Sequence, residues 1–297
     1  MKIVERMGHV ALRVPDLDPV LRHATEILGL RVVSEEDGWI CLTCGPRHHD
    51  LMLAEGDELA LDHVSFEAPD AAAIEQLAGA LARDGVEILS DRPEEPGVAH
   101  SLRFRAPGGH VFEVYAEMEQ APAHYNGPGV RPRKYGHTTL RALSVREMAE
   151  FAGRYLGFIE SDRVGDQLRW MRCDADHHGL ALFAGDPPGL HHHAWEVESW
   201  SYLELLGDRL LANGKRLLYG PGRHGPGLNL FSYHLDPAGV CIEYFADIEQ
   251  VHDPANLGRD WPNTGETINQ WGPAPPDEFL TFCAPVAEPT LASIGGS

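Results

Sequence analysis

The sequence predicts an α+β fold in which four βαβββ modules pair into two domains. Two observations predict it: histidine-led strand-like segments recur along the chain, and each is followed by an amphipathic helix and three further strand-like runs. The repeat is roughly 55–70 residues long, and a unit of that length buries its sheet poorly on its own. We therefore expect the modules to pair. The four leading strands are predicted at 8–12, 62–66, 136–140 and 192–195.

Each leading strand is followed by a helical pattern that ends near a glycine. In the third module Ser144 and Glu147 form a capping-box pattern, which indicates a helix start. A glycine after the last apolar position is typical of a helix C-terminus. The four apolar stripes are Val20, Ala24, Ile27 and Leu28 before Gly29; Ile74, Leu77, Ala78 and Leu81 before Gly85; Met148, Phe151 and Tyr155 before Gly157; and Leu203, Leu206, Leu210 and Leu211 before Gly214.

The division between the two domains is predicted in the segment 120–133. Pro122, Pro128 and Pro132 interrupt both the strand and the helix periodicity there. We expect an N-terminal domain over 1–122 and a second domain over 133–250. Residues 251–297 contain many prolines and show little periodicity, which predicts an irregular C-terminal extension.

The amino-acid composition limits the classes of binding partner that we expect. The 297 residues contain 24 Lys and Arg against 45 Asp and Glu, a formal charge of −21. Such a field repels phosphate groups, so we expect neither nucleic acid nor an anionic membrane surface as a partner. No apolar stretch approaches the ~20 residues that span a bilayer. With five scattered cysteines and no signal-peptide pattern, a cytoplasmic location is expected, and Cys41 and Cys44 are interpreted as buried thiols.

Three metal-ligand side chains occupy matching strands in the second half. His137 lies on the first strand of module three, His192 on the first strand of module four, and Glu243 on the last strand of module four. Two imidazoles and one carboxylate on one face leave three adjacent coordination positions open, as non-haem Fe(II) oxygen chemistry requires. Each residue alone is more often structural, but their repeat-equivalent placement favours a metal site. Mn(II) is possible with the same ligand types.

The segment around Glu243 resembles the type I extradiol dioxygenases of the vicinal oxygen chelate superfamily, which is the glyoxalase and bleomycin-resistance fold. The resemblance rests on 222–224 (Gly-Arg-His), seven intervening residues, and 232–239 (Ser-Tyr-His-Leu-Asp-Pro-Ala-Gly) followed by Glu243. It covers about residues 5–250. Ser232 departs from the family, which usually has an aliphatic or aromatic residue there; this affects the packing beside Tyr233 and removes no catalytic group.

The resemblance also implies which side chains act around the metal. His178 matches the histidine beside the dioxygen site, which would supply a proton during ring cleavage; His177 is the alternative. His224 and Tyr233 match the pair that hydrogen-bonds the diol and assists its deprotonation. His192 lies six residues before Glu198, as in the family, so we take it as the ligand. Its neighbours His191 and His193 are expected to point away, because adjacent strand residues face opposite sides.

The first half repeats the ligand set without the diol-handling pair. His9, His63 and Glu113 match the three ligands, and His49 matches His178. Aligning Pro107 with Pro237, however, places Arg103 opposite Tyr233 and Glu94 opposite His224. An arginine and a glutamate do not replace a neutral proton shuttle, so we expect the first domain to be catalytically silent, with a structural or adventitious metal there as the alternative.

The activity implied is cleavage of a catechol-type ring next to its two hydroxyls, with both atoms of O2 inserted, in the degradation of aromatic compounds. The cofactor implied is Fe(II), the partners are the catechol and O2, and a homo-oligomer is expected because family members are often multimeric. Trp195, Phe231 and the segment 251–280 are candidates for the pocket wall.

Two other functions remain as alternatives. The first is a glyoxalase-like metal lyase or isomerase, whose sites typically take a fourth ligand from the last strand of the other module; here that strand, 180–183, contains no donor. The second is a metal-free binding protein of the drug-sequestering type, which has no need for the polar set described above.

Overall fold

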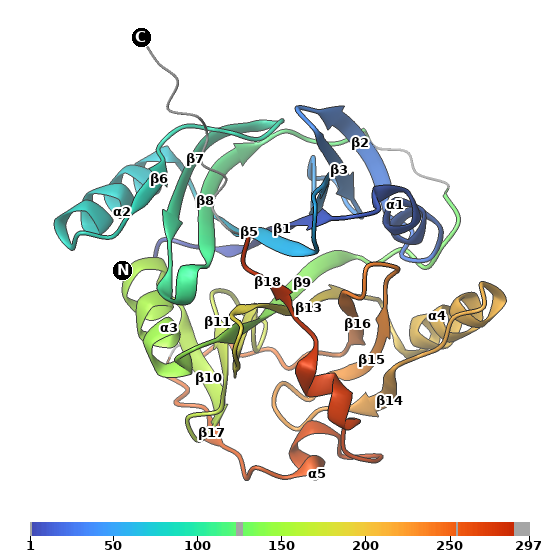
Figure 1. Ribbon diagram of the computed structural model, residues 1–297. Coiled ribbons are helices and arrows are strands. Elements are labelled where there is room, and N and C mark those ends of the chain that lie inside the picture. Colours follow the sequence, from blue (N-terminus) through green and yellow to red (C-terminus); the bar gives the residue numbers. More distant parts are fainter. Residues whose placement is uncertain (1, 123–126, 254, 288–297) are drawn as a thin grey trace.

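The computed structural model describes residues 2–122, 127–253 and 255–287, and its first half contains two of the predicted modules (Figure 1). Part of the predicted linker (123–126) and the last ten residues of the predicted extension (288–297) lie outside the described residues. The first module comprises β1 (Arg6–Val14), α1 (Leu17–Glu26), β2 (Arg31–Glu36), β3 (Trp39–Thr43) and β4 (Leu51–Glu55). The second comprises β5 (Ala60–Glu67), α2 (Ala71–Arg83), β6 (Ile88–Ser90), β7 (Val98–Arg105), the 3-10 turn η1 (Pro107–Gly109) and β8 (Val111–Met118).

The second half repeats the same order of elements. The third module comprises β9 (Lys134–Ala142), α3 (Val145–Phe151), the π-helical turn η2 (Ala152–Leu156), β10 (Ile159–Val164), β11 (Leu168–Arg172) and β12 (Leu180–Ala184). The fourth comprises β13 (Gly189–Glu196), α4 (Trp200–Ala212), β14 (Tyr219–Arg223), β15 (Leu230–Leu235) and β16 (Cys241–Ala246). The predicted α+β fold of four βαβββ modules is confirmed.

Each pair of modules forms one sheet, joined through the modules' leading strands. The first sheet has the order β2-β3-β4-β1-β5-β8-β7-β6, in which β1 and β5 are antiparallel neighbours. The second has β9 and β13 as the antiparallel centre of β14-β15-β16-β13-β9-β12-β11-β10. Each sheet curves around its central pair (Figure 1). The histidines that lead the modules therefore meet in the middle of their sheets.

The helix signals in the sequence act as expected. The Ser144 hydroxyl accepts a hydrogen bond from the Glu147 backbone N–H at 3.2 Å, which caps the start of α3. Gly157, in the left-handed conformation, ends the helical turn that follows α3. Leu203, Leu206 and Leu210 of α4 are buried. The apolar stripe of α4 thus packs into the core beside β15 and β16.

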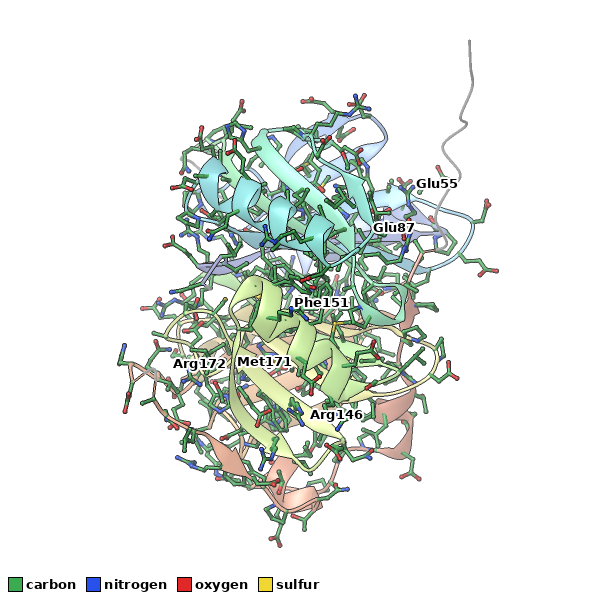
Figure 2. All side chains as sticks on the ribbon, turned by 90° about the vertical axis from the view of Figure 1, so that its left-hand side faces the viewer. Glu55, Glu87, Arg146, Phe151, Met171 and Arg172 are labelled. Carbon is green, nitrogen blue, oxygen red and sulfur yellow. The ribbon has the colours of Figure 1, made fainter. Side chains whose placement is uncertain are left out.

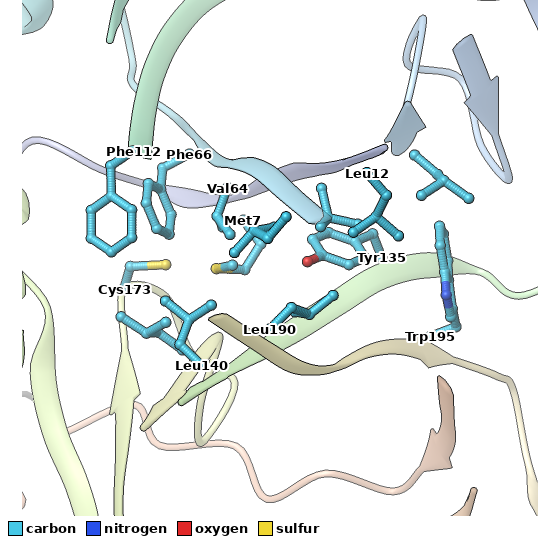
Figure 3. Close-up of a cluster of buried hydrophobic side chains, with 14 of the residues drawn as sticks. Met7, Leu12, Val64, Phe66, Phe112, Tyr135, Leu140, Cys173, Leu190 and Trp195 are labelled. Carbon is cyan, nitrogen blue, oxygen red and sulfur yellow. The ribbon is translucent and has the colours of Figure 1, made fainter. Parts of the chain in front are cut away.

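A shared apolar core joins the two halves (Figure 3). Val64 and Phe66 from β5 face Leu140 from β9 and Leu190 from β13, and all four are at most 1% exposed. Trp195 belongs to this core, where its ring lies 5.3 Å from that of Tyr135. The prediction that Trp195 lines the pocket is therefore wrong, because its side chain projects from the opposite face of β13.

The segment after β16 wraps around the second sheet and returns to the centre of the molecule (Figure 1). It contains the short strands β17 (Arg259–Asp260) and β18 (Ala284–Pro285), the helix α5 (Gly265–Ile268) and the 3-10 turn η3 (Asp277–Thr281). β18 pairs with β13, and Val286 forms a bridge to Leu61 of the first sheet. The division into 1–122, 133–250 and 251–297 stays a proposal.

Aromatic and ionic contacts join the two halves at their interface. Phe151 of α3 lies between the two halves in Figure 2, with its ring 6.1 Å from that of Phe104 in β7. Arg154 and Tyr155 both donate to the Asp84 carboxylate at 2.8 Å. None of the helices in the described parts of the chain is long and apolar enough to cross a bilayer.

Candidate metal centre

The register of the second sheet places the predicted ligands in one row. His137 of β9 is opposite Ala194 of β13, Ala194 is opposite Glu243 of β16, and Glu243 is opposite Tyr233 of β15. His192 lies two residues before Ala194 and therefore shares its face. Four neighbouring strands thus bring the three predicted ligands and one predicted diol contact onto the concave face.

The three side chains converge on a common point. Glu243 Oε2 lies 3.1 Å from His137 Nε2 and 3.2 Å from His192 Nε2, and all three residues are at least 94% buried. Metal–ligand bonds of about 2.1 Å at right angles place neighbouring ligand atoms about 3 Å apart. The donor set and its spacing therefore fit a divalent transition metal. Burial alone would raise the pKa of Glu243, but His137 and His192 hold that pKa well below its usual range.

The glycine before His137 leaves room for the Phe245 ring to pack against the strand at this point. A Cβ at Gly136 would collide with the Phe245 ring. That ring lies 4.9 Å from the His137 ring and helps to fix the plane of the imidazole. The glycine–histidine pair at the start of this module thus has a steric reason.

His192 is held in one tautomer by a chain of hydrogen bonds. The Phe279 carbonyl can only accept, so the proton on His191 is on Nε2, 2.7 Å away. Burial lowers the pKa of His191 to about 3, so the ring is neutral and its Nδ1 accepts from His192 Nδ1 at 2.6 Å. His192 Nε2 is then left with its lone pair directed to the metal position. Thr139 Oγ1 lies 2.9 Å from that atom.

This arrangement corrects the prediction that His191 points away from the site. The pairing of β9 with β13 shifts register between Leu190 and His192, which is a β-bulge. A bulge breaks the strict alternation of side chains on which that prediction relied. His193, by contrast, points to the other face, where its Nδ1 accepts a hydrogen bond from Trp195 Nε1 at 2.8 Å.

Tyr233 and His224 lie next to the ligand carboxylate. The Tyr233 hydroxyl is 2.7 Å from Glu243 Oε2 and 2.9 Å from His224 Nε2. His224 Nδ1 donates to the Ile268 carbonyl at 2.6 Å, and burial lowers the pKa of His224 to about 4, so its Nε2 is an acceptor at neutral pH. The Phe231 ring stacks on His224 at 3.9 Å, which places Phe231 behind the pocket wall.

His178 stands beside His137, with the two ring centroids 4.5 Å apart. Burial lowers the pKa of His178 well below its usual value, so the ring is neutral. Its Nδ1 lies 3.0 Å from Nδ1 of His177, which turns outward to Asp162 with a separation of 3.1 Å. His178 lines the pocket and His177 does not. The structure thus brings all six predicted site residues together.

Asn229 is a site residue that our sequence reasoning missed. Its Nδ2 donates to Glu243 Oε1 at 3.0 Å, so it orients the carboxylate from the side opposite Tyr233. Asn229 is fully buried. Asn229 immediately precedes β15, and its even spacing of four residues from Tyr233 was the available signal.

These residues form the floor of a pocket of about 410 Å³. Leu168, Trp170 and Phe183 form one wall, and Phe279 and Leu280 lie on another. The segment 251–280 contributes Asn263, Thr264, Gly265, Ile268, Ala274, Pro275, Phe279 and Leu280 to the lining, as expected. The pocket is therefore mostly apolar, with its polar groups gathered at the metal position.

The first sheet carries a related cluster of His9, His63 and Glu113. The alignment with Pro237 places Glu94 opposite His224, but the structure brings Glu95 into the cluster and leaves Glu94 at its edge. Arg103 is opposite Glu113 in the register, as Tyr233 is opposite Glu243. The diol-handling pair is thus replaced by a carboxylate and a guanidinium.

Comparison with known proteins identifies the superfamily and the fold. The Glyoxalase/Bleomycin resistance protein/Dioxygenase superfamily model matches residues 6–114 and 134–244, which are the two sheets. The chain belongs to this superfamily. The resemblance inferred from the segment around Glu243 is confirmed, and so is the fold class, although the roles of the individual site residues stay predictions.

Relatives of known function extend along nearly the whole chain. Metapyrocatechase 2 of Cupriavidus necator is 30% identical over 93% of this chain and 92% of its own length. The manganese-dependent 2,3-dihydroxybiphenyl 1,2-dioxygenase of Geobacillus genomosp. 3 is 26% identical over 87% of this chain and 88% of its own. Among solved structures, the Mn(II)-bound glyoxalase from Novosphingobium aromaticivorans is 27% identical, covers 98% of this chain and 97% of its own, and has a TM-score of 0.89.

Proposed function

We propose that this protein is an extradiol dioxygenase that cleaves a catechol-type ring beside its two hydroxyls, with a divalent metal held by His137, His192 and Glu243. The observation that carries the proposal is the row across β9, β13, β16 and β15, which places two imidazoles, a carboxylate and a tyrosine at one point. The relatives named as metapyrocatechase and dihydroxybiphenyl dioxygenase support the same reaction class.

The metal proposed is Fe(II), with Mn(II) as the alternative that the same donors accept. When bound, it would supply adjacent positions for the two diol oxygens and for dioxygen. The three protein ligands come from one side, and the pocket opens on the other. Such a one-sided ligand set leaves room for substrate beside the ion.

Tyr233 and His224 are proposed to take the proton of the diol. Because His224 Nδ1 is committed to the Ile268 carbonyl, its Nε2 is free to accept, and the Tyr233 hydroxyl connects that atom to the metal position. A diol hydroxyl placed near Tyr233 would donate to the Tyr233 oxygen while Tyr233 donates to His224. A proton could leave the diol by this route without crossing the apolar wall.

His178 is proposed to act on the dioxygen side. It is neutral, buried and next to His137 in the pocket lining. A neutral imidazole holds one transferable proton and one lone pair, so it can stabilise charge that develops on oxygen and then donate a proton.

The substrate proposed is an uncharged catechol with an apolar substituent. Among the described residues that line the pocket there is no lysine or arginine, and Glu243 is the sole carboxylate. A carboxylated substituent would be desolvated without a cationic partner, which costs several kcal/mol. The walls formed by Trp170, Phe183 and Phe279 favour an alkyl or aryl group instead.

The test is oxygen uptake by anaerobically Fe(II)- or Mn(II)-loaded protein with a panel of diols. We expect one O2 consumed per diol and a new visible absorbance from the ring-opened product. 3-Methylcatechol and 2,3-dihydroxybiphenyl should give kcat/KM values at least about tenfold above 3,4-dihydroxyphenylacetate, the charged control. Absence of turnover with every diol would refute the reaction class, whereas a preference for the charged diol would refute only the substrate assignment.

A glyoxalase-type reaction is the second candidate, because one of the similar structures is titled a glyoxalase. The structure argues against it in one respect. The strand β12, from which a fourth ligand would come, presents Ala181, Leu182 and Phe183 to the pocket. Conversion of a methylglyoxal–glutathione adduct without oxygen uptake would favour this candidate over ring cleavage.

A further inference from the structure

We propose that the first sheet holds a second, structural divalent-metal site formed by His9, His63, Glu95 and Glu113. One ligand atom from each of these residues lies within 4.8 Å of all the others. The proposal is independent of the function proposed for the second half, because it concerns different side chains and a different role for the ion.

The ligand atoms have the spacing of a four-coordinate ion. His9 Nε2 lies 3.1 Å from His63 Nε2, 3.0 Å from Glu95 Oε2 and 3.6 Å from Glu113 Oε2, and His63 Nε2 lies 4.0 Å from Glu113 Oε2. Bonds of about 2.1 Å in a tetrahedron separate ligand atoms by about 3.4 Å. The observed distances lie around that value, and imidazole with carboxylate is a usual donor set for such ions.

An orphaned oxygen points into the same space. Glu95 Oε2 is buried and accepts no well-aligned hydrogen bond from the described residues, although His9 Nε2 and His49 Nε2 lie 3.0 and 3.3 Å away. Glu95 is 7% exposed, so water does not readily replace the missing partner. Atoms that are close but poorly aligned for hydrogen bonding to each other fit donors aimed at a common centre.

The surrounding residues orient the ligands as metal sites require. The Asp62 carboxylate lies 2.8 Å from His63 Nδ1 and holds a proton on that nitrogen, while His63 Nε2 lies 2.6 Å from Glu95 Oε1. An ion would replace the proton that Nε2 shares with Glu95. Ser65 Oγ donates to Glu113 Oε2 at 2.9 Å. Both contacts are the kind that hold ligating histidines and carboxylates in place.

Arg103 limits the charge of the site without filling it. Its Nε donates to Glu113 Oε1 at 3.1 Å and its Nη2 donates to Glu95 Oε1, so it uses the other oxygen of each carboxylate. The second oxygen of each carboxylate, Oε2, is therefore left on the side that His9 Nε2 faces. Arg103 and Glu95 also stand on the side that Tyr233 and His224 occupy in the second half, so the ion would have no open face for a diol.

The experiment is a Co²⁺ titration of metal-free full-length protein, with elemental analysis after desalting. The wild type should bind two ions per chain. The double variant His137→Ala/His192→Ala, which lacks both imidazoles of the second-half site, should still bind one. If that double variant retains no stoichiometric ion, the proposal is wrong, and Arg103 alone serves as the cation of the cluster.

A matched pair of variants in the same background tests the ligands. Glu95→Gln should weaken the remaining Co²⁺ binding by at least about tenfold. Glu94→Gln should leave it unchanged, because the Glu94 side chain is 42% exposed and contacts the edge of Arg103. Should Glu95→Gln fail to fold, the number of Co²⁺ ions bound by the double variant still tests whether the first sheet holds an ion. A thiolate-to-cobalt absorption band would instead assign the ion to the nearby Cys41, His48 and His49 and would overturn the proposal.

Discussion

At the scale of single residues, the hydrogen bonding of the site depends on which acceptor the Tyr233 hydroxyl chooses. Tyr233 has one hydroxyl proton and two acceptors, Glu243 Oε2 and His224 Nε2. A metal that engages the Glu243 oxygen weakens it as an acceptor, so the proton turns to His224. Metal binding would thereby direct the Tyr233 proton to His224 and leave the Tyr233 oxygen able to accept from the diol, without movement of the backbone.

His178 should affect chemistry more than binding. We expect His178→Gln to lower kcat for ring cleavage by about 10²–10⁴-fold, because glutamine cannot transfer a proton at neutral pH. The dissociation constant of the anaerobic diol complex should change less than about threefold, since Tyr233 and His224, the proposed diol contacts, are unaltered. Stopped-flow mixing with O2 measures the first quantity and anaerobic titration the second.

The control for this experiment is His177→Gln, which alters the outward neighbour that does not line the pocket. Its kcat should fall by much less. If His178→Gln turns over at the wild-type rate, the assignment of the proton donor to His178 fails.

The residues of the site were predictable where they follow the repeat. The ligands, His178, His224 and Tyr233 recur at module-equivalent positions or in the segment around Glu243, so the sequence alone was sufficient to place them. Glu95 and Asn229 were missed because each lies in a connection whose length sets which side chain faces inward. From Glu95 to Arg103 the chain is one residue shorter than from His224 to Tyr233, so Glu95 and not Glu94 reaches the cluster.

At the scale of elements, the bulge in β13 turns two adjacent side chains to the same face of the strand, which regular alternation does not allow. It lets His191 stand beside His192 on the pocket side and reach the Phe279 carbonyl of η3. The tautomer of a metal ligand thus depends on a turn almost ninety residues later in the chain. Bulges follow from local twist and packing rather than from residue type, which is why the sequence did not reveal this one.

The turn between β15 and β16 should give a measurable pH dependence. Burial raises the pKa of Asp236 to about 6, while its Oδ1 accepts from the backbone N–H groups of Ala238 and Val240. A folded pKa above the usual value of 3.8 means that stability present at low pH is lost as pH rises through 6. The ionised carboxylate would then cost on the order of 2–3 kcal/mol at pH 8.

Asp236→Asn keeps the acceptor and stays neutral, so its Tm should exceed that of the wild type most at pH 8 and by about half as much at pH 5, because the loss of stability extends from pH 3.8 to 6. Thermal unfolding between pH 5 and pH 8 measures the difference. Asp91→Asn, which alters an exposed carboxylate, should show no such trend. A Tm difference that is the same at every pH would contradict the role of Asp236 ionisation.

At the scale of the whole molecule, the two sheets share one core. The Phe66 ring of the first half lies 5.5 Å from the Phe158 ring of the second, and both side chains are at most 4% exposed. The Tyr244 hydroxyl also donates toward the backbone carbonyls of Leu28 and Val130 at 2.8 and 2.9 Å. Periodicity predicted the modules and their pairing, but it could not predict which faces meet, because that depends on the shape of both surfaces.

We therefore expect the two halves to unfold together. Phe158→Ala should cost about 3–5 kcal/mol and lower the Tm of a single transition, since it opens a cavity between the sheets. Differential scanning calorimetry measures it, with Leu257→Ala as the control because Leu257 is 92% exposed. Two separate transitions, only one of them shifted, would show that the shared core does not couple the halves.

The pocket is built from two sources that the chain can change independently. The proposed metal ligands belong to neighbouring strands of a hydrogen-bonded sheet, whereas part of the pocket wall comes from the irregular segment after β16. Substitutions in that segment can reshape the cavity around a ring substituent and leave the oxygen-handling groups in register. The architecture thus separates the choice of compound from the reaction carried out on it, which gives such an enzyme room to acquire new aromatic substrates.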